Sequence, residues 1–422
     1  SMMSFSQTTF RRLATGVSGA LLIILSMTPP AIAQKLATLE VVVGGNPAGI
    51  TIPVSTNLDG ITHVAVDELA LHKIEGSKRT AVPFQVNNGR ERTLTWLVSD
   101  KEKSQRFELT RASKPSGASG VKTVERDGAL VLAAGNKELL SYNFEVMKPP
   151  AGVNEVFGRS GFIHPLRSPK GHVLTRIQPP DHYHHYGVWN PWTHALYDGD
   201  TVDFWNLNAR QGTVRFANFL SVINGEVFGE YSAIHDHIAF KNGKENTAIR
   251  ELQTVRVYAP QDNYYIADIT VDMNIPGKPV RLLEYRYGGL GWRATEQWTK
   301  ENSRVLTSEG KTRKDADGSI ARWCIVDGTV DGENAGIVMM SYPTNYNHPE
   351  PLRIWPENAN RNRGDMFANF SPTKNKDWQL DPGENYVLKY RFIVFDGQFS
   401  KEQAEAAWQA FASPPIVKVS KN

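Results

Sequence analysis

Short apolar runs separated by turn residues make up most of the chain after residue 33. Over residues 36–110, β-branched and aromatic residues alternate with polar ones, as in the runs 39–43 and 94–98. Gly, Pro and Asn stand between such runs, as at 44–47. Alternation with a period of two is typical of strands that bury one face. The pattern therefore predicts a small N-terminal β-sandwich module over residues 34–112.

Longer and more aromatic runs follow from about residue 123, after a stretch rich in Ser, Gly and Lys that suits a linker. Such runs lie at 213–219, 254–258, 264–271 and 386–395. One helix is predicted over residues 401–411, where Ala404, Trp408 and Phe411 form an apolar stripe behind a capping Ser400. We therefore predict an all-β chain whose main domain, residues 123–415, is a large antiparallel β-sandwich with one C-terminal helix.

The first 33 residues have the pattern of a signal peptide. A basic pair, Arg11 and Arg12, precedes an apolar stretch at 13–27, and small residues at 31–33 mark a cleavage site before Gln34. We expect an exported, periplasmic protein, delivered by the general or the twin-arginine route. No later stretch reaches the roughly 18 apolar residues that a membrane-spanning helix needs, so we expect no membrane span in the mature chain.

Charge and cysteine content exclude several classes of protein. The 422-residue chain has a formal net charge of +3, and removal of Arg11 and Arg12, the only charged residues before residue 34, leaves +1. A protein that binds nucleic acid needs a basic face, so this near-neutral balance argues against a nucleic-acid partner. The single cysteine, Cys324, permits no intramolecular disulfide and no zinc site built from cysteines. The oligomeric state stays open.

Six of the 11 histidines lie between residues 164 and 194, and the densest group is Asp-His-Tyr-His-His-Tyr-Gly at 181–187. In an extended conformation His182 and His184 would point to one side, where two imidazoles can bind a divalent metal ion with His164 as the third ligand. The same imidazoles could instead transfer protons near neutral pH. A single histidine on a strand is more often a half-buried polar side chain, so the prediction of a site rests on the whole cluster.

Aromatic residues crowd around this cluster. Tyr183, Trp189 and Trp192 lie near Asp181 and Asn190, and flat rings beside carboxylate and amide groups suit the stacking and hydrogen bonding of a sugar ring. Each of these rings could equally fill the core of a large β-sandwich. We favour the binding role for Trp189 and Trp192, because the Asn-Pro step between them interrupts a strand and leaves both rings near a loop.

A tyrosine and an arginine lie together in the run 284–293. Tyr285, Trp292 and Arg293 stand on either side of glycines that mark a bulge or a close backbone approach. A tyrosine beside an arginine suits proton transfer next to a carboxylate. We therefore expect this run to reach the histidine cluster.

A Pro-rich loop further along the chain carries His348, Glu350, Arg353 and Trp355. Loops with such residues often hold functional groups, and we expect this one to reach the cluster as well. Glu350 and Arg353 could equally form a solvated ion pair.

Several of these motifs together resemble a known family. They are Ile163-His164-Pro165-Leu166, Ser168-Pro169-Lys170-Gly171, the run at 181–187, Tyr287-Gly288-Gly289-Leu290 with Trp292-Arg293, and Pro382-Gly383-Glu384. The chain resembles the PmoA-like exported proteins, a family of unknown function, over residues 36–412. The resemblance implies an exported, mostly β protein of the two-sheet supersandwich type found in sugar mutarotases and polysaccharide lyases. It also implies a role in sugar or glycoside processing.

We therefore expect a periplasmic carbohydrate-active enzyme that cleaves a glycoside or oligosaccharide with the help of a metal ion or of histidines. Elimination is favoured over hydrolysis, because no pair of carboxylates stands out as the acid and nucleophile of a glycosidase. The expected catalytic residues are His185, Tyr285, Arg293, His348 and Arg353, with His185 or Tyr285 as the base. The expected ligands of a divalent metal ion are His164, His182 and His184. The expected substrate-binding residues are Asp181, Tyr183, Trp189, Asn190, Trp192, Trp292 and Trp355.

Two alternative functions remain open. A non-catalytic glycan-binding protein would hold sugar with its aromatic loops and use the histidines only to hydrogen-bond hydroxyl groups. A mononuclear metal oxidoreductase would use the histidines to hold a redox-active iron or copper ion.

Overall fold

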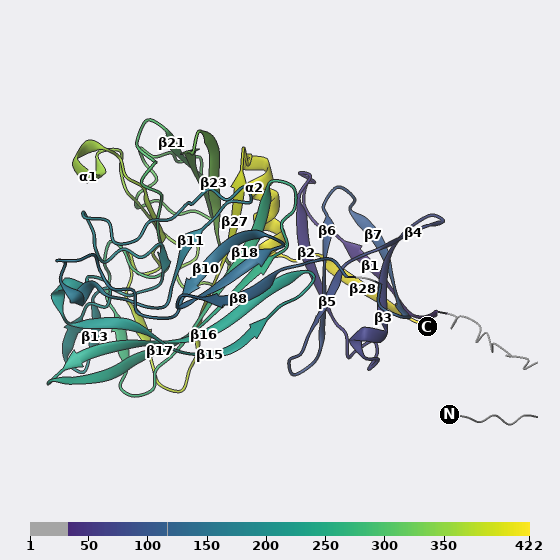
Figure 1. The fold of residues 1–422 in the computed structure, drawn as a ribbon, viewed down its shortest axis with the longest axis horizontal. Coiled ribbons are helices and arrows are strands. Elements are labelled where there is room, and N and C mark those ends of the chain that lie inside the picture. The colour runs from purple at the N-terminus through teal and green to yellow at the C-terminus, as the bar shows by residue number, and fades with distance from the viewer. Residues whose placement is uncertain (1–32, 116) are drawn as a thin grey trace, which may run out of the picture.

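The computed structural model describes residues 33–115 and 117–422. The protein is mostly β, with antiparallel sheets packed in layers, which confirms the predicted all-β, sandwich-like fold class. Figure 1 shows the N-terminal strands at one end of the molecule and the larger sandwich at the other. The predicted signal peptide lies outside the described residues, apart from Ala33.

Two eight-stranded sheets form the large sandwich. The first, called the central sheet, contains in spatial order β15 (Gly212–Ile223), β16 (Phe228–Lys241), β17 (Lys244–Tyr258), β18 (Tyr264–Asn274), β27 (Tyr386–Asp396), β23 (Glu333–Ser341), β22 (Trp323–Val330) and β21 (Ser303–Thr307). The second, called the site sheet, contains β24 (Leu352–Ile354), β25 (Phe367–Phe370), β20 (Gly291–Arg293), β12 (Val188–Trp189), β11 (Phe162–Leu166), β10 (Lys137–Asn143), β9 (Ala129–Ala134) and β8 (Lys122–Arg126).

The period-two pattern decides which side of the central sheet each side chain faces. On β18, Tyr265, Ala267 and Ile269 belong to the core between the two large sheets, whereas Tyr264 and Ile266 pack toward the N-terminal strands. Both faces of the central sheet are therefore covered, which explains why its strands are rich in apolar and aromatic residues. The site sheet has one face in the same core, and its outward face carries a smaller aromatic cluster.

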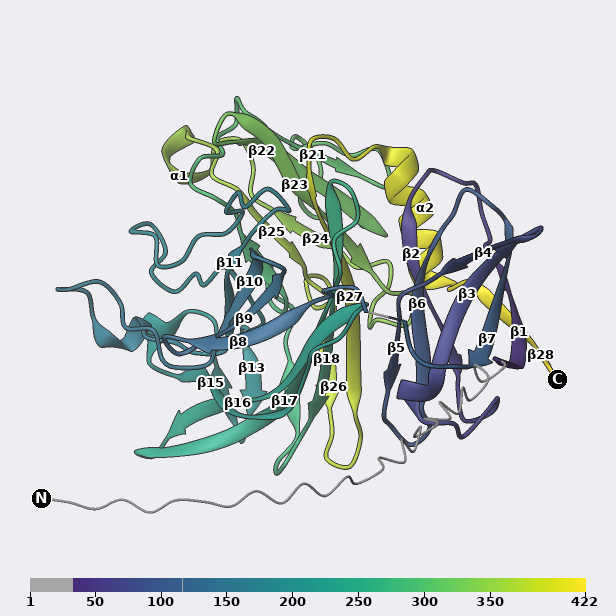
Figure 2. The ribbon, with the colours of Figure 1, turned by 45° about the vertical axis from the view of Figure 1, so that its right-hand side comes forward.

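Two small sheets form the N-terminal part. One contains β28 (Ile416–Lys421), β1 (Gln34–Val42), β7 (Ser104–Arg111), β3 (Leu69–Glu75) and β4 (Lys78–Ala81), and the other contains β2 (Thr51–Asn57), β6 (Thr93–Ser99) and β5 (Phe84–Asn87). β28 comes from the far end of the chain and pairs antiparallel with β1, with Ala37 opposite Lys421 and Val42 opposite Ile416 (Figure 2). The last strand of the chain thus completes the first sheet.

The helix α2 (Lys401–Ala412) follows the predicted apolar stripe. The Ser400 side chain accepts a hydrogen bond from the Gln403 N–H, and the Gln403 side chain bonds back to the Ser400 backbone, so a capping box starts the helix. Ala404, Trp408 and Phe411 are buried in the same core as the N-terminal strands and the outer face of the central sheet.

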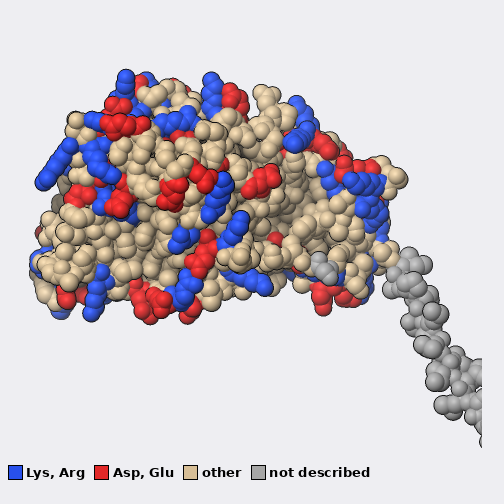
Figure 3. Space-filling model, turned by 45° about the horizontal axis from the view of Figure 1, so that its top comes forward, with Lys and Arg blue, Asp and Glu red and all other residues tan. Residues whose placement is uncertain are grey.

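The remaining elements are short. A four-stranded sheet contains β14 (Asp200–Val202), β13 (Ala195–Tyr197), β19 (Val280–Leu282) and β26 (Trp378–Leu380). Single 3₁₀ turns lie at Val66–Glu68, Glu155–Phe157 and Leu207–Ala209, and α1 (Ala359–Asn362) is a single turn in which Asn360 and Arg361 have left-handed dihedral angles. Within the described residues, no helix is both long and apolar enough to cross a membrane. Acidic and basic side chains are interspersed on the face that Figure 3 shows.

Candidate functional site

The predicted histidine cluster is a tight turn and not a strand. The His182 N–H donates to the Pro179 carbonyl (2.9 Å), and the His185 N–H donates to the His182 carbonyl (3.0 Å). Pro179 and Pro180 have no N–H for a sheet ladder, and their fixed φ favours turns. The expectation that these side chains alternate across a strand is therefore wrong. The turn instead gathers the rings of His182, His184 and His185, with centroids 4.6 to 5.3 Å apart.

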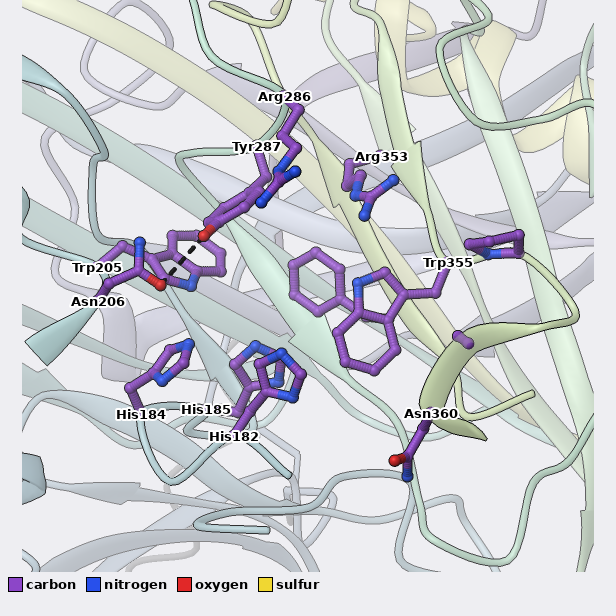
Figure 4. A pocket seen from close by; sticks show the side chains of 13 residues that line it. His182, His184, His185, Trp205, Asn206, Arg286, Tyr287, Arg353, Trp355 and Asn360 are labelled. Atoms are coloured by element: carbon purple, nitrogen blue, oxygen red, sulfur yellow. Dashed lines mark hydrogen bonds between the residues drawn. The ribbon is translucent and has the colours of Figure 1, made fainter. Parts of the chain in front are cut away.

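This histidine turn, residues 179–185, forms one wall of a pocket of about 440 Å³ on the outward face of the site sheet. The lining residues are His182, His184, His185, Trp205, Asn206, Arg286, Tyr287, Arg353, Trp355, Pro356, Ala359, Asn360 and Phe367 (Figure 4). Aromatic, basic and amide-bearing side chains dominate this set. None of the described residues that line the pocket is Asp or Glu, so the permanent charges of its lining are the guanidinium groups of Arg286 and Arg353.

A buried aromatic cluster forms the floor of the pocket. On β12 and β25, Val188 and Ala368 face the sandwich core, whereas Trp189 and Phe367 point outward. The His185 ring centroid lies 5.1 Å from that of Trp189 and 5.3 Å from that of Phe367. Because packed rings have few alternative rotamers, this floor holds the His185 ring in one orientation.

A buried arginine holds the histidine turn from behind. Arg293, which is 1% exposed, donates from Nη1 to Asp181 Oδ2 (2.6 Å), and from Nη2 to Asp181 Oδ1 (3.1 Å) and Asp365 Oδ2 (2.9 Å). Asp181 Oδ2 also accepts from His182 Nδ1 (2.8 Å). Burial alone would raise the pKa of Asp181, but the hydrogen bonds from His182 and Arg293 hold that pKa well below its usual range. Asp181 is therefore an ionised anchor.

The contacts of the ring nitrogens decide the tautomers of two histidines. An ionised carboxylate only accepts hydrogen bonds, so neutral His182 carries its hydrogen on Nδ1 and presents an unprotonated Nε2. A guanidinium only donates, so His185 Nδ1 accepts the 3.1 Å contact from Arg293 Nη1, and its Nε2 carries the hydrogen. Burial lowers the pKa of His185 well below its usual value and lowers that of His184 to about 3. His184 and His185 are therefore uncharged at neutral pH.

Ring nitrogens of the three histidines lie within 4.8 Å of one another, close enough to hold a divalent metal ion. His182 has the arrangement common in metal sites, where a carboxylate orients one ring nitrogen and leaves the other free. His184 makes no hydrogen bond to the described residues, so either of its nitrogens can offer a lone pair. His185 fits less well, because its lone pair already faces Arg293.

A family model matches residues 129–409, and the family is described as one of unknown function (DUF6807). The chain belongs to this family. The DUF6807 region contains every residue that lines the pocket, and also the buried anchor of Asp181, Arg293 and Asp365. β1 to β8 and β28 lie outside this region. No curated protein matches the chain.

Seven of the expected site residues in the DUF6807 region lie at the pocket. They are His182, His184, His185, Arg353 and Trp355 in its lining, and Asp181 and Arg293 in the anchor behind it. Arg353 does not pair with Glu350, because its Nη1 donates to Asp317 Oδ2 (3.1 Å) and Glu350 is fully buried elsewhere. His185 Nε2 carries a hydrogen, whereas the free lone pair of the neutral His182 ring is on Nε2.

Four of the expected substrate-binding residues lie in the protein interior. Trp189, Asn190, Trp192 and Trp292 are each at most 1% exposed, and none of them lines the pocket. The Trp292 indole N–H donates to the Leu174 carbonyl (2.9 Å), and Asn190 Nδ2 donates to Glu251 Oε1 (2.8 Å). The Asn-Pro step does end β12, but the chain after it folds inward, so Trp192 fills the core and Trp189 lies beneath the pocket floor.

Two expected residues on the histidine side lie away from the pocket lining. His164 Nδ1 bonds to Thr175 Oγ1 (2.7 Å), and burial lowers the pKa of His164 to about 4. It lines a different cavity and is absent from the group of three histidines, so His185 replaces His164 as the third imidazole. The Tyr183 ring packs on Phe157, with centroids 5.7 Å apart.

Two expected catalytic residues are also displaced from the pocket. The Tyr285 ring lies over His194, with centroids 3.9 Å apart. Tyr287, two residues later, lines the pocket in its place. The His348 ring lies parallel to Trp408 of α2, with centroids 6.3 Å apart, and faces the helix instead of the site.

Several pocket residues escaped the sequence-based prediction. They are Trp205, Asn206, Arg286, Tyr287, Asn360 and Phe367, with Asp365 behind them. Tyr287 had a local signal, because it belongs to the same short run as Tyr285. Its hydroxyl donates to Asn206 Oδ1 (3.1 Å), and burial raises its pKa to about 12. No sequence motif marks Asn360 or Phe367 as a site residue. They reach the histidines only because the chain after β24 folds back toward the histidine turn.

Proposed function

We propose that the chain is a carbohydrate-active enzyme that binds an acidic sugar in this pocket and cleaves it by elimination. One observation carries the proposal: three imidazoles, of which those of His184 and His185 are uncharged, and two arginines line one aromatic cavity in which no described lining residue is a carboxylate. A glycosidase needs a pair of carboxylates beside the scissile bond, and this lining offers none. A carboxylate on the substrate would instead find arginine partners.

The substrate carboxylate is assigned to the arginine side of the pocket. Arg286 is exposed and forms no ion pair with the described residues, and its guanidinium lies 5.7 Å from the centre of the Tyr287 ring. Arg353 faces the same cavity and shares its charge with Asp317. Figure 4 shows Arg286 and Arg353 along one side and the histidines along the other. A sugar between them would rest on the rings of Trp205 and Trp355.

His182 is the proposed base. Its Nε2 takes the proton from the carbon next to the substrate carboxylate, and that electron pair forms a carbon–carbon double bond as the glycosidic bond at the next carbon breaks. The departing glycosidic oxygen takes the proton back from the imidazolium, so the enzyme returns to its starting state and no water or oxidant is consumed. Asp181 stabilises the imidazolium through Nδ1. The His185 Nε2–H and the arginines stabilise the negative charge that develops on the carboxylate.

We also propose the location and the substrate class that the sequence led us to expect. The resemblance to PmoA-like exported proteins and the signal-peptide pattern support a periplasmic enzyme that acts on fragments of complex carbohydrates. A second version of the proposal assigns charge stabilisation to a divalent metal ion, and the close approach of three histidines supports it. Treatment with a chelator separates the two versions: activity that survives supports histidine-assisted elimination, and activity that is lost and restored by a divalent ion supports the metal.

The test uses His182→Gln, with the exposed His63→Gln in the N-terminal part as the control. Wild type is incubated with uronate-containing oligosaccharides, and the conjugated double bond of the product is followed by its ultraviolet absorbance. We expect His182→Gln to lower the turnover rate by at least about a hundredfold while substrate affinity stays within a few-fold, and His63→Gln to match wild type. Saccharide binding without turnover by wild type would support the non-catalytic glycan-binding alternative, and unchanged turnover in His182→Gln would refute the assignment of the base.

A further inference from the structure

A second cavity of about 740 Å³ adjoins the pocket. His182 and Asn360 line both cavities, so the two spaces are neighbours on either side of the histidine turn and α1. Figure 4 shows Asn360 on α1 at the margin of the first pocket. Arg361 and Arg363 line the second cavity but not the first. A ligand longer than one sugar unit that lies along His182 would have its next unit beside the second cavity.

The carboxylates around the second cavity already have arginine partners. Asp181 and Asp365 accept from the buried Arg293, Asp365 also accepts from Arg363, and Glu296 lies 3.4 Å from Arg176. These contacts join three acidic side chains to three arginines.

Arg361 is the fourth arginine in this region. It is exposed, and among the described residues it has no ion pair and no hydrogen bond through its guanidinium. A guanidinium that lines a cavity without an acidic partner suits an anion brought by the ligand.

The backbone around Arg361 is in an unfavourable conformation. Asn360, Arg361 and Asn362 have φ values of 51°, 56° and 66°, in the left-handed region that arginine rarely adopts. The Asn360 side chain donates to Asp365 Oδ2 (2.7 Å), which ties this turn to the anchor that holds the histidine turn. Strain of this kind persists where the surrounding structure holds it, and here the Asn360 contact with the anchor does so.

We propose that the second cavity is a subsite for a second acidic unit of the same ligand, with Arg361 as the partner of its carboxylate. The inference rests on the proposed function and narrows the substrate class to an acidic oligosaccharide. One acidic unit would lie near Arg286 and Arg353, the next near Arg361, and the linkage between them would lie beside His182. Two observations support this assignment: the guanidinium of Arg361 has no acidic partner among the described residues, and His182 and Asn360 line both cavities.

The test compares Arg361→Gly with Arg210→Gly. Arg210 is also an exposed arginine in the left-handed region (φ 58°), and it lines neither cavity, so it is a matched control. Glycine adopts this conformation without strain, so both variants should have unfolding temperatures at or above that of wild type. Every protein in this test also carries His182→Gln, so that the trimers are not cleaved, and wild type here denotes the chain with that substitution alone. Calorimetric titration uses galacturonate, tri-galacturonate, glucuronate, a trimer of glucuronate and, as the neutral control, maltotriose.

Wild type should bind an acidic trimer at least about tenfold more tightly than the corresponding monomer, and it should bind maltotriose more weakly than that trimer. Arg361→Gly should lose about tenfold in affinity for the trimer and keep its affinity for the monomer. Arg210→Gly should match wild type with both.

Equal affinities of wild type for monomer and trimer would overturn the second subsite and leave the proposed function in place. The same conclusion would follow if Arg361→Gly bound the trimer as wild type does, or lost affinity for monomer and trimer equally. If wild type bound none of the acidic sugars, both the second subsite and the proposed function would fail.

Discussion

Glu350 is a fully buried carboxyl group held by three donors. Ser341 Oγ and Asn345 Nδ2 donate to its Oε1, and the Tyr390 hydroxyl donates to its Oε2, each at 2.7 Å. Burial raises the pKa of Glu350 to about 7, because desolvation outweighs the hydrogen bonds that favour the ionised form. From the sequence, a solvated ion pair with Arg353 was one of two alternatives for this residue, and the structure shows instead a buried group that holds its proton up to neutral pH.

This residue should make the protein less stable as the pH rises. An unperturbed glutamate titrates near 4.5, so unfolding between about pH 4.5 and pH 7 releases a proton, and the free energy of unfolding falls across this range and levels off above it. The full change is on the order of 3 kcal/mol. We expect urea unfolding to show that the stability of Glu350→Gln relative to wild type increases by about this amount from about pH 5 to about pH 8.

The control for this measurement is Glu125→Gln, at an exposed position on β8. Its stability should follow that of wild type across the pH range. A difference between Glu350→Gln and wild type that stays constant from about pH 5 to about pH 8 would contradict the raised pKa.

Residue type alone did not decide which aromatic side chains reach the pocket. Trp189, Trp192 and Trp355 were all predicted to bind substrate, and only Trp355 lines the cavity. Strand alternation does explain adjacent residues once the strand is known: on β20, Trp292 faces the core, whereas Arg293 faces outward and bonds to Asp181. The phase of that alternation depends on which face of the sheet is covered, and a single sequence does not show this.

At the scale of elements, runs with strong local signals were predicted well. The apolar stripe and the cap of α2, and the alternating runs of β18 and β27, are where the pattern placed them. The histidine turn was predicted as an extended segment, although the Pro179-Pro180 pair before it favours a turn. Turns that depend on a few backbone hydrogen bonds leave a weaker pattern than strands that bury a face.

The strand β28 should protect the edge of the N-terminal sheet. It pairs with β1 over six residue pairs, yet most of its side chains are exposed, so its main contribution is the row of backbone hydrogen bonds. We expect deletion of residues 416–422 to leave the β1 edge unpaired and to cause concentration-dependent association, seen by light scattering, with faster amide exchange in β1.

A full-length Val419→Lys variant is the matched control, because it keeps the backbone pairing and changes only a partly exposed side chain. It should stay dispersed like wild type. If the shortened chain also stayed dispersed at high concentration with unchanged exchange in β1, the protective role of β28 would be refuted.

At the scale of the whole molecule, the parts of the site that escaped prediction are those that long-range contacts assemble. Asp365 reaches Arg293 across 72 positions of the chain, and Arg293 reaches Asp181 across 112. The local sequence pattern marked the histidine turn and Arg293 as two separate candidate motifs. Their meeting point, and the contribution of Asn360 from α1, follow from the order of β24, β25, β20 and β12 in the site sheet, which composition and periodicity do not encode.

The same long-range packing should make the molecule unfold as one unit. Trp96 and Phe107 of the N-terminal strands share a single apolar core with Ile266 and Phe395 of the central sheet and with Phe411 of α2. A module that shares its core with its neighbour cannot lose its own packing without exposing apolar surface on the other. We therefore expect calorimetry to show one unfolding transition for wild type.

Trp96→Ala tests this expectation, because Trp96 is fully buried in the shared core. The substitution should reduce the free energy of unfolding by about 3 to 5 kcal/mol and move the whole transition to lower temperature. Val66→Ala, at a position 39% exposed in the N-terminal part, should leave the transition almost unchanged. If Trp96→Ala instead split the transition and left a second peak at the wild-type temperature, the N-terminal strands would form an independent unit, and the site sheet would owe none of its stability to them.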